Sequence, residues 1–147
     1  MATINDNGTG TASYGIINET FATIENLIGS ENDDTLVATG LSSAILRGRG
    51  GNDVLTGSNG NNSLFGENGN DTLIGGAGDD ELFGNDGDDI LIGNFGLDLL
   101  IGGDGDDSLF GGEGEDELFG NDGDDVLFGG PDLDELFGGA GDNQLFE

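Results

Sequence analysis

Leucine recurs every nine residues along most of the chain, and this spacing dominates the pattern of apolar and polar positions. From Gly48 to Phe146 the sequence divides into eleven units of nine, with Gly first and Leu eighth in every unit. Gly is also fourth in ten units, and the sixth residue is Asp in nine units and Asn in two. A fixed short period indicates a repeat architecture rather than a conventional globular core.

Each nine-residue unit is predicted to form a six-residue turn followed by a three-residue strand. Side chains alternate between the faces of a strand, so only the eighth residue needs to be apolar and point inward. Glycines at the first and fourth positions permit positive φ angles and close backbone approach. Residues 75–110 and 111–146 agree at 24 of 36 positions, which indicates four units in two coils. We therefore predict two columns of turns joined by two short parallel sheets.

The regular array, residues 48–146, is preceded by two segments of different character. Residues 1–19 are predicted to be a polar N-terminal segment, either a mobile end or an arm used in assembly. Residues 20–47 are predicted to contain degenerate repeats, because one inserted residue near Ala38 brings Leu27 and Leu36 into register with the later leucines. Terminal repeats are usually atypical because they close off the stack, so this segment is a candidate N-terminal cap.

The charge balance excludes several classes of function. There are 31 acidic residues, two arginines and no lysine, histidine or cysteine, for a formal charge of −29. Such a chain repels phosphate backbones, which argues against nucleic-acid binding. No apolar run approaches the roughly 20 residues of a membrane-spanning helix, so membrane insertion is not expected. The usual general base and cysteine nucleophile are missing, and no small-molecule substrate is evident.

Stacking two units per coil places the sixth-position residues of alternate units above one another. Carboxylates about 4.8 Å apart repel each other unless a cation lies between them. Calcium suits such a site because it takes six to eight oxygen ligands, including backbone carbonyls. Six turns in one column and five in the other leave nine gaps, so we expect about nine Ca²⁺ ions, which would change the charge from −29 to −11.

The predicted side-chain ligands are Asp53, Asp71, Asp89, Asp107, Asp125 and Asn143 in one column and Asn62, Asp80, Asp98, Asp116 and Asp134 in the other. The predicted backbone carbonyl ligands are those of Gly75, Gly76, Gly78, Gly84, Gly87, Gly102, Gly103, Gly105, Gly111, Gly112, Gly114, Gly120 and Gly123. Asp34 is a candidate for an extra site.

The nonapeptide Gly-Gly-x-Gly-x-Asp-x-Leu-x, seen at residues 102–110, resembles the repeat of the RTX (repeats-in-toxin) family. The segment 24–27, Ile-Glu-Asn-Leu, leading to Gly29 and Asp34, is similar to segments that precede such arrays. The resemblance implies a right-handed parallel β-roll with calcium in every turn, unfolded in low calcium and ordered outside the cell. It also implies secretion without a cleavable N-terminal signal peptide, which agrees with the polar residues 1–11.

Three departures from the family pattern are visible. Pro131 and Asp132 interrupt one unit, which predicts a distorted site beside Asp134. Asn62 and Asn143 can bind a cation through oxygen but carry no charge, which predicts weaker sites. Family members usually carry a C-terminal flank, whereas this sequence ends one residue after the last unit, so it is either truncated or presents an open end.

The outward-facing seventh and ninth positions differ between the two sheets. One outer face is nearly all apolar, and the other sets glutamates beside its phenylalanines. Large exposed apolar patches mark association, although flat sheets also tolerate rows of exposed aromatic residues. The predicted assembly surface contains Ile74, Ile90, Ile92, Phe110, Val126, Phe128 and Phe146 on this face, and Phe95, Leu97 and Leu133 in the turns. Local packing is the alternative explanation for the three turn residues.

We therefore predict an all-β fold, a parallel β-roll (β-solenoid) with two nonapeptide units per coil and a degenerate N-terminal capping segment. The leading functional hypothesis is a non-catalytic, extracellular calcium-binding protein that folds on binding calcium and self-associates, end to end or face to face, into a filament or surface assembly. The alternative is a detached RTX module of a larger type I-secreted enzyme or adhesin, which aids folding and secretion. A carbohydrate-active solenoid is disfavoured because its regular carboxylates would be occupied by metal.

Overall fold

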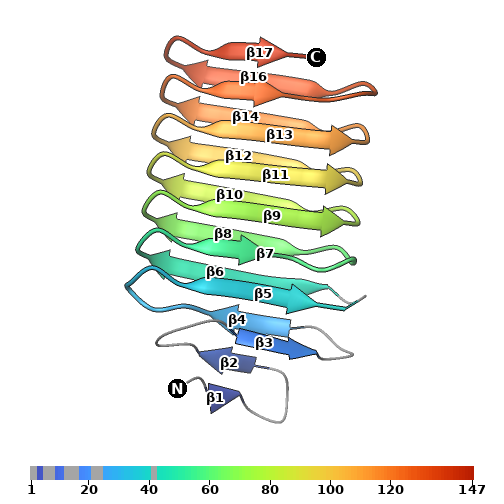
Figure 1. The fold of residues 1–147 in the computed structure, drawn as a ribbon. Coiled ribbons are helices and arrows are strands. Elements are labelled where there is room, and N and C mark those ends of the chain that lie inside the picture. Colours follow the sequence, from blue (N-terminus) through green and yellow to red (C-terminus); the bar gives the residue numbers. More distant parts are fainter. Residues whose placement is uncertain (1–2, 5–8, 12–16, 21–24, 41–42) are drawn as a thin grey trace.

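The chain winds into a parallel solenoid whose successive strands alternate between two sheets, with β1 and β17 at opposite ends of the stack (Figure 1). The computed structural model describes residues 3–4, 9–11, 17–20, 25–40 and 43–147. It has about seven turns of about 18 residues each. The predicted all-β parallel solenoid is therefore confirmed. Within the described residues, no helix is long and apolar enough to cross a membrane.

The first sheet, sheet A, is formed in spatial order by β1 (Thr3–Ile4), β2 (Thr9–Thr11), β4 (Glu25–Ile28), β6 (Ala44–Gly50), β8 (Ser63–Asn68), β10 (Glu81–Asp86), β12 (Leu99–Asp104), β14 (Glu117–Asp122) and β16 (Glu135–Ala140). Sheet B is formed by β3 (Ile17–Thr20), β5 (Thr35–Thr39), β7 (Val54–Thr56), β9 (Thr72–Ala77), β11 (Ile90–Phe95), β13 (Ser108–Glu113), β15 (Val126–Phe128) and β17 (Gln144–Phe146). The β1–β2 pair is antiparallel, and the other described pairs are parallel.

Most strands of the array are longer than the three residues predicted. β10 runs from Glu81 to Asp86 and crosses the boundary between two units, and its pairing with β12 skips Gly84 at that boundary. The next residue, Asn85, has a φ of 81°, so the chain changes direction there while the following residues still pair with the adjacent coil. The predicted six-residue turn is thus a bent continuation of the strand followed by a short turn.

The core is formed by the eighth-position leucines, which stack in one row along each sheet. Leu46 and the eighth-position leucines of the array through Leu127 have no solvent exposure, because each lies between the two sheets and between the coils above and below. Leu64 pairs with Leu82 at a separation of 18 residues, whereas Leu27 pairs with Leu46 at a separation of 19. The extra residue agrees with the insertion predicted near Ala38.

The N-terminal boundaries stay predictions. Residues 1–2, 5–8, 12–16, 21–24 and 41–42 lie outside the described residues, so the predicted mobile or assembling arm at 1–19 is only partly covered. β2 and β3, which precede residue 20, already pair with β4 and β5 in the two sheets. Within the described part of the chain, both sheets therefore extend below the regular array.

Candidate metal sites

The sixth-position side chains form two ladders, one in each column of turns. In each ladder the backbone N–H of one coil donates to the side-chain Oδ1 of the next coil, 18 residues later. Asp71 donates to Asp89 at 2.7 Å, and Asp80 donates to Asp98 at 2.8 Å in the other column. The structure thus brings together the residues of each predicted column, from Asp53 to Asn143 and from Asn62 to Asp134.

The second carboxylate oxygen of these aspartates has no hydrogen-bond partner. Among the described side chains, the buried Oδ2 atoms without a partner belong to Asp53, Asp71, Asp80, Asp89, Asp98, Asp107, Asp116, Asp125 and Asp134. Leaving a buried acceptor unsatisfied costs roughly 1–3 kcal/mol, and more when the group is charged. Each turn with such an aspartate therefore needs a proton or a cation at Oδ2.

At seven of these aspartates, the unpaired Oδ2 and a backbone carbonyl oxygen of the next coil both lie close to the first-position glycine. A Cβ placed on Gly84 would overlap Oδ2 of Asp89 and lie 2.7 Å from the carbonyl oxygen of Gly102. Neither oxygen carries a hydrogen, so the two repel each other unless a positive charge lies between them. A methyl group would fill the space in which these oxygens converge, which explains why the first position is always glycine.

The first-position glycine serves one of the two purposes predicted for it, close backbone approach, but not a positive φ. No first-position glycine in residues 48–146 has a positive φ. The positive angles occur at the fourth position, as at Gly105 (φ 130°), and also at the second, as at Gly103 (φ 131°) and Asn85 (φ 81°). The first glycine is needed for close approach, and the left-handed backbone is provided by the second and fourth residues.

Backbone carbonyls enter each gap from both coils. Those of Gly75, Gly84, Gly102, Gly111 and Gly120 lie against the preceding coil, and those of Gly78, Gly87, Gly105, Gly112 and Gly123 lie against the following coil. For Gly76, Gly103 and Gly114, no such approach is among the described contacts. In the described part of the chain no three acidic side chains converge on one point. A cation in these gaps would therefore take most of its ligands from carbonyls, an arrangement that suits calcium.

Comparison with known proteins agrees with this geometry. Four copies of the RTX calcium-binding nonapeptide repeat match residues 47–82, 65–100, 83–118 and 110–145, which together cover about two thirds of the chain. The chain belongs to the RTX calcium-binding nonapeptide repeat family. The repeat is a non-catalytic, calcium-binding module, and it is typical of proteins secreted by the type I route. A search of curated proteins gives no match.

One RTX unit departs from the pattern in its strand but keeps its ladder. β15 ends at Phe128, and its pairing does not continue past the unit boundary, because Pro131 has no N–H to donate. Asp132 takes the fourth-position conformation with a φ of 96°. The N–H of Asp116 still donates to Oδ1 of Asp134 at 3.0 Å. The irregularity predicted near Asp134 therefore lies in the strand and leaves its place in the ladder intact.

Asn62, Asn143 and Asp34 occupy ladder positions but differ from the nine aspartates. Asn143 accepts the N–H of Asp125 at 2.8 Å. Oδ2 of Asp34 accepts hydrogen bonds from Ser30, and Oδ1 of Asn62 accepts hydrogen bonds from Ser58. The predicted role of Asn62, binding a cation through its oxygen, does not fit this geometry because that oxygen already has donors.

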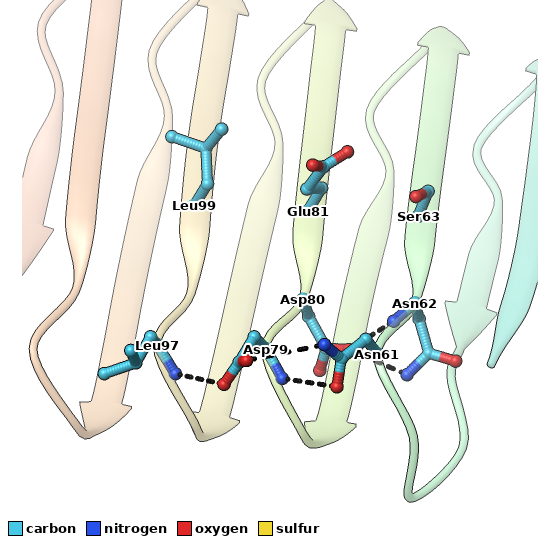
Figure 2. A pocket seen from close by; sticks show the side chains of 8 residues that line it. All are labelled: Asn61, Asn62, Ser63, Asp79, Asp80, Glu81, Leu97 and Leu99. Carbon is cyan, nitrogen blue, oxygen red and sulfur yellow. Dashed lines mark hydrogen bonds between the residues drawn. The ribbon is translucent and has the colours of Figure 1, made fainter. Parts of the chain in front are cut away.

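The fifth-position side chains form a further, exposed ladder, which runs beside the ladder from Asn62 to Asp134. In Figure 2 the N–H of Asp79 donates to Oδ1 of Asn61 at 3.0 Å, and the N–H of Leu97 donates to Oδ1 of Asp79 at 3.2 Å. Leu97 has no side-chain acceptor to continue the series. These residues lie beside a shallow groove over the turns and the start of sheet A, lined by Asn61, Asn62, Ser63, Asp79, Asp80, Glu81, Leu97 and Leu99.

Burial raises the pKa of the ladder aspartates. Loss of hydration is the largest cause, and for Asp89 the charges of Asp71 and Asp88 raise the pKa further, against the lowering effect of the Asp71 N–H. The pKa reaches about 7 for Asp89, Asp98 and Asp107 and about 6 for Asp53, Asp71 and Asp80, and it is also raised for Asp116 and Asp125. In the metal-free fold these carboxylates thus hold protons more tightly than they would in the unfolded chain.

Substituting one ladder aspartate should weaken calcium-dependent folding, while its neighbour should tolerate the same change. We expect Asp89→Asn to raise the calcium concentration at half-folding several-fold, because an uncharged amide replaces the unpaired oxygen. Asp88→Asn is the matched control, because it removes the same charge from an exposed side chain in the same turn and keeps the oxygen that accepts the N–H of Asp106. The measurement is circular dichroism during calcium titration, and equal shifts in both variants would contradict the site.

Acidification should weaken calcium binding. The folded pKa values of about 6 to 7 lie above the ~3.9 of an unfolded aspartate, so protons stabilise the metal-free fold, and this stability is lost as the pH rises through that range. Calcium must displace those protons. We expect the calcium concentration at half-saturation to rise about tenfold or more between pH 7.5 and pH 5.5, measured with a calcium electrode at constant ionic strength. A pH-independent value would show that the metal-free chain is unfolded throughout this range, with its aspartates already ionised, so that calcium displaces no protons.

Proposed function

We propose that the chain is a calcium-dependent folding module of a secreted protein, disordered in low calcium and folded where calcium is abundant. The observation that supports this most directly is the set of nine buried Oδ2 atoms without a partner, seven of which share the space beside a first-position glycine with a backbone carbonyl oxygen of the next coil. A fold that leaves so many acceptors unsatisfied is incomplete without a cation. The ladder residues other than Asn62 and the glycine carbonyls are the proposed ligands, and about eight ions is the proposed number, one for each of the nine gaps except that between Asn62 and Asp80.

The composition makes the fold dependent on these ions. The formal charge is −29, and only 33% of the residues are hydrophobic. The leucine rows provide one buried side chain for each nine residues, so the core is small relative to the charge around it. An ion that binds only the folded state adds RT ln(1 + [Ca²⁺]/Kd), which is about 1.4 kcal/mol per site at a tenfold excess over Kd. Several sites together can therefore control whether the chain folds.

Dependence on calcium would restrict folding of the chain to the outside of the cell. RTX repeats are typical of type I-secreted proteins, and calcium is far more abundant outside cells than in the cytoplasm. A module that stays unfolded until it meets calcium would remain extended during export and fold after it. We propose an extracellular or cell-surface location and a non-catalytic role on this basis.

Calcium titration tests this proposal directly. In chelator we expect a far-ultraviolet circular dichroism spectrum without β-structure, and in millimolar calcium a β-rich spectrum, with one cooperative transition shared by metal binding and folding. Magnesium at the same concentration is the control, because it is smaller and dehydrates reluctantly. A β-rich spectrum in chelator would contradict the proposed mechanism.

A second candidate function, self-association, is supported by the outer face of sheet B. We name as the uncharged face its outward side chains Thr35, Val37, Val54, Thr56, Thr72, Ile74, Ile90, Ile92, Ser108, Phe110, Val126, Phe128, Gln144 and Phe146. None carries a charge, and Ile90 and Phe146 are each 43% exposed. The outer face of sheet A carries Glu81, Glu117 and Glu135 instead.

We propose that the uncharged face packs against the same face of a second copy. In a chain with a charge of −29, contact through most other surfaces would bring carboxylates together, whereas this face meets its own copy without repulsion. Phe110, Phe128 and Phe146 stack with ring centroids 5.2 and 4.5 Å apart, which makes a flat apolar ridge. A shallow groove lined in part by Ile92, Phe95 and Pro131 continues the face toward the turns.

Leu97 and Leu133 lie further along those turns, 59% and 81% exposed, and remain candidates for a lateral contact. No observation in the described part of the chain supports the predicted end-to-end association or filament, so neither is part of this proposal.

Charge introduced on the uncharged face should abolish association. We expect the calcium-loaded chain to be a dimer by analytical ultracentrifugation and Phe110→Glu to be a monomer. Phe119→Glu is the matched control on sheet A, because both rings lie between an isoleucine and a phenylalanine of adjacent coils. A monomeric unmodified chain at high concentration would contradict the proposal and leave the face free for another part of a larger protein.

A further inference from the structure

Besides the last turn, which carries Asn143, two turns of the solenoid close without an unpaired carboxylate oxygen, and both carry serine at the second position. They are residues 29–34, with Ser30, and residues 57–62, with Ser58. In the other ten units of the array the second residue is Gly, Asn, Glu or Arg, and every one of them has a positive φ. Neither serine does. The preceding strands, β4 and β7, also end before the serine, whereas most strands continue to the third position of the next unit.

In the turn 57–62 the orientation of the Asn62 amide is determined by three donors. Oδ1 of Asn62 accepts hydrogen bonds from the Ser58 hydroxyl at 3.0 Å, the Ser58 N–H at 3.3 Å and the Ala44 N–H at 3.0 Å. An amide can be assigned from its hydrogen-bond partners. Because all three groups donate, the oxygen must face them, and the NH₂ group faces the gap toward the next coil.

Four oxygens surround the nitrogen of that NH₂ group. Nδ2 of Asn62 lies 2.5 Å from the carbonyl oxygen of Gly60, 2.8 Å from Oδ1 of Asp80, 3.3 Å from the carbonyl oxygen of Gly75 and 3.4 Å from that of Ser58. These atoms belong to the second and fourth residues of one turn and the first and sixth residues of the next. In the other gaps the atom that corresponds to Nδ2 is an aspartate Oδ2 without a partner.

In the turn 29–34 the sixth residue is an aspartate, and its Oδ2 also has hydrogen-bond donors within the turn. Oδ2 of Asp34 accepts the Ser30 N–H at 2.6 Å and the Ser30 hydroxyl at 2.8 Å. This oxygen corresponds to the one that lacks a partner in the nine ladder aspartates. The serine hydroxyl thus replaces an external positive charge with an internal donor, and the oxygen predicted to bind an extra ion at Asp34 is already occupied.

We propose that the serine turns are metal-independent. The gap between the turns 57–62 and 75–80 holds no calcium, because the Asn62 amide supplies the positive end of a dipole where the other gaps need a cation. The turn 29–34 is closed by Ser30 in the same way. In each column, the serine turn is therefore held by side-chain hydrogen bonds, and the turns that follow it by ions. This inference rests on the proposed calcium sites in the other turns.

Anomalous diffraction from a calcium-loaded crystal tests the inference on the unmodified chain. We expect calcium peaks between Asp80 and Asp98 and between Asp71 and Asp89, and no peak between Asn62 and Asp80. A peak in the Asn62 gap beside the others would overturn the inference while supporting the calcium sites. A map without peaks in any gap would instead overturn the proposed function.

Restoring the family pattern in the serine turn should create one more site. We expect the double variant Ser58→Gly/Asn62→Asp to bind one more Ca²⁺ per chain than the unmodified protein, counted by native mass spectrometry in saturating calcium. Asn61→Asp is the matched control, because it adds the same charge to an exposed side chain of the same turn, and it should leave the count unchanged. An unchanged count in the folded double variant would show that the gap already holds an ion or that serine is not what excludes it, and either result overturns the inference.

Discussion

Parallel stacking of identical residues is the constraint on which this structure depends. A coil of 18 residues places each leucine on a leucine, which builds the core, and each sixth-position aspartate on an aspartate, which opposes it. One oxygen of each aspartate is satisfied by the backbone N–H of the preceding coil, and the other is not. The geometry that buries the apolar rows therefore creates the demand for a cation, so folding and ion binding are two aspects of one arrangement.

The glycines show how closely the turn and the site are connected. Gly84 has an ordinary φ, yet any side chain there would occupy the space between Asp89 and the carbonyl of Gly102. Asn85, with a φ of 81°, bends the strand so that its continuation remains paired with the next coil. Asparagine tolerates this conformation better than most residues. The regular spacing of glycine and aspartate within the unit is therefore needed to position the carboxylate and carbonyl oxygens as well as to reverse the chain.

The period, the leucine rows and the two aspartate columns could be predicted because each follows from repetition and the alternation of side chains along a strand. The length of the strands could not be predicted, because it depends on the left-handed φ of residues such as Asn85 and Glu67. Their residue types are common in any turn and do not indicate this conformation. The orientation of Asn62 was equally inaccessible. From its charge alone, asparagine is expected to be a weak ligand. The groups that donate to the Asn62 oxygen, Ser58 and Ala44, come together only when the coils are stacked.

The position of the two serine turns gives the solenoid a direction. In a solenoid each coil contacts only its neighbours, so the free energy of folding is approximately a sum of contributions from the coils and their interfaces. A coil that is stable by itself therefore provides the strand edge on which the next coil pairs. Residues 29–34 and 57–62 each precede the unpaired aspartates of their own column of turns. The turns closed by their own serines need no ion to position β5 and β8, the strands that follow them. An ion-dependent coil that folds next to such a strand pairs with a neighbour that is already ordered. The conformational entropy lost when the first calcium site forms is therefore smaller.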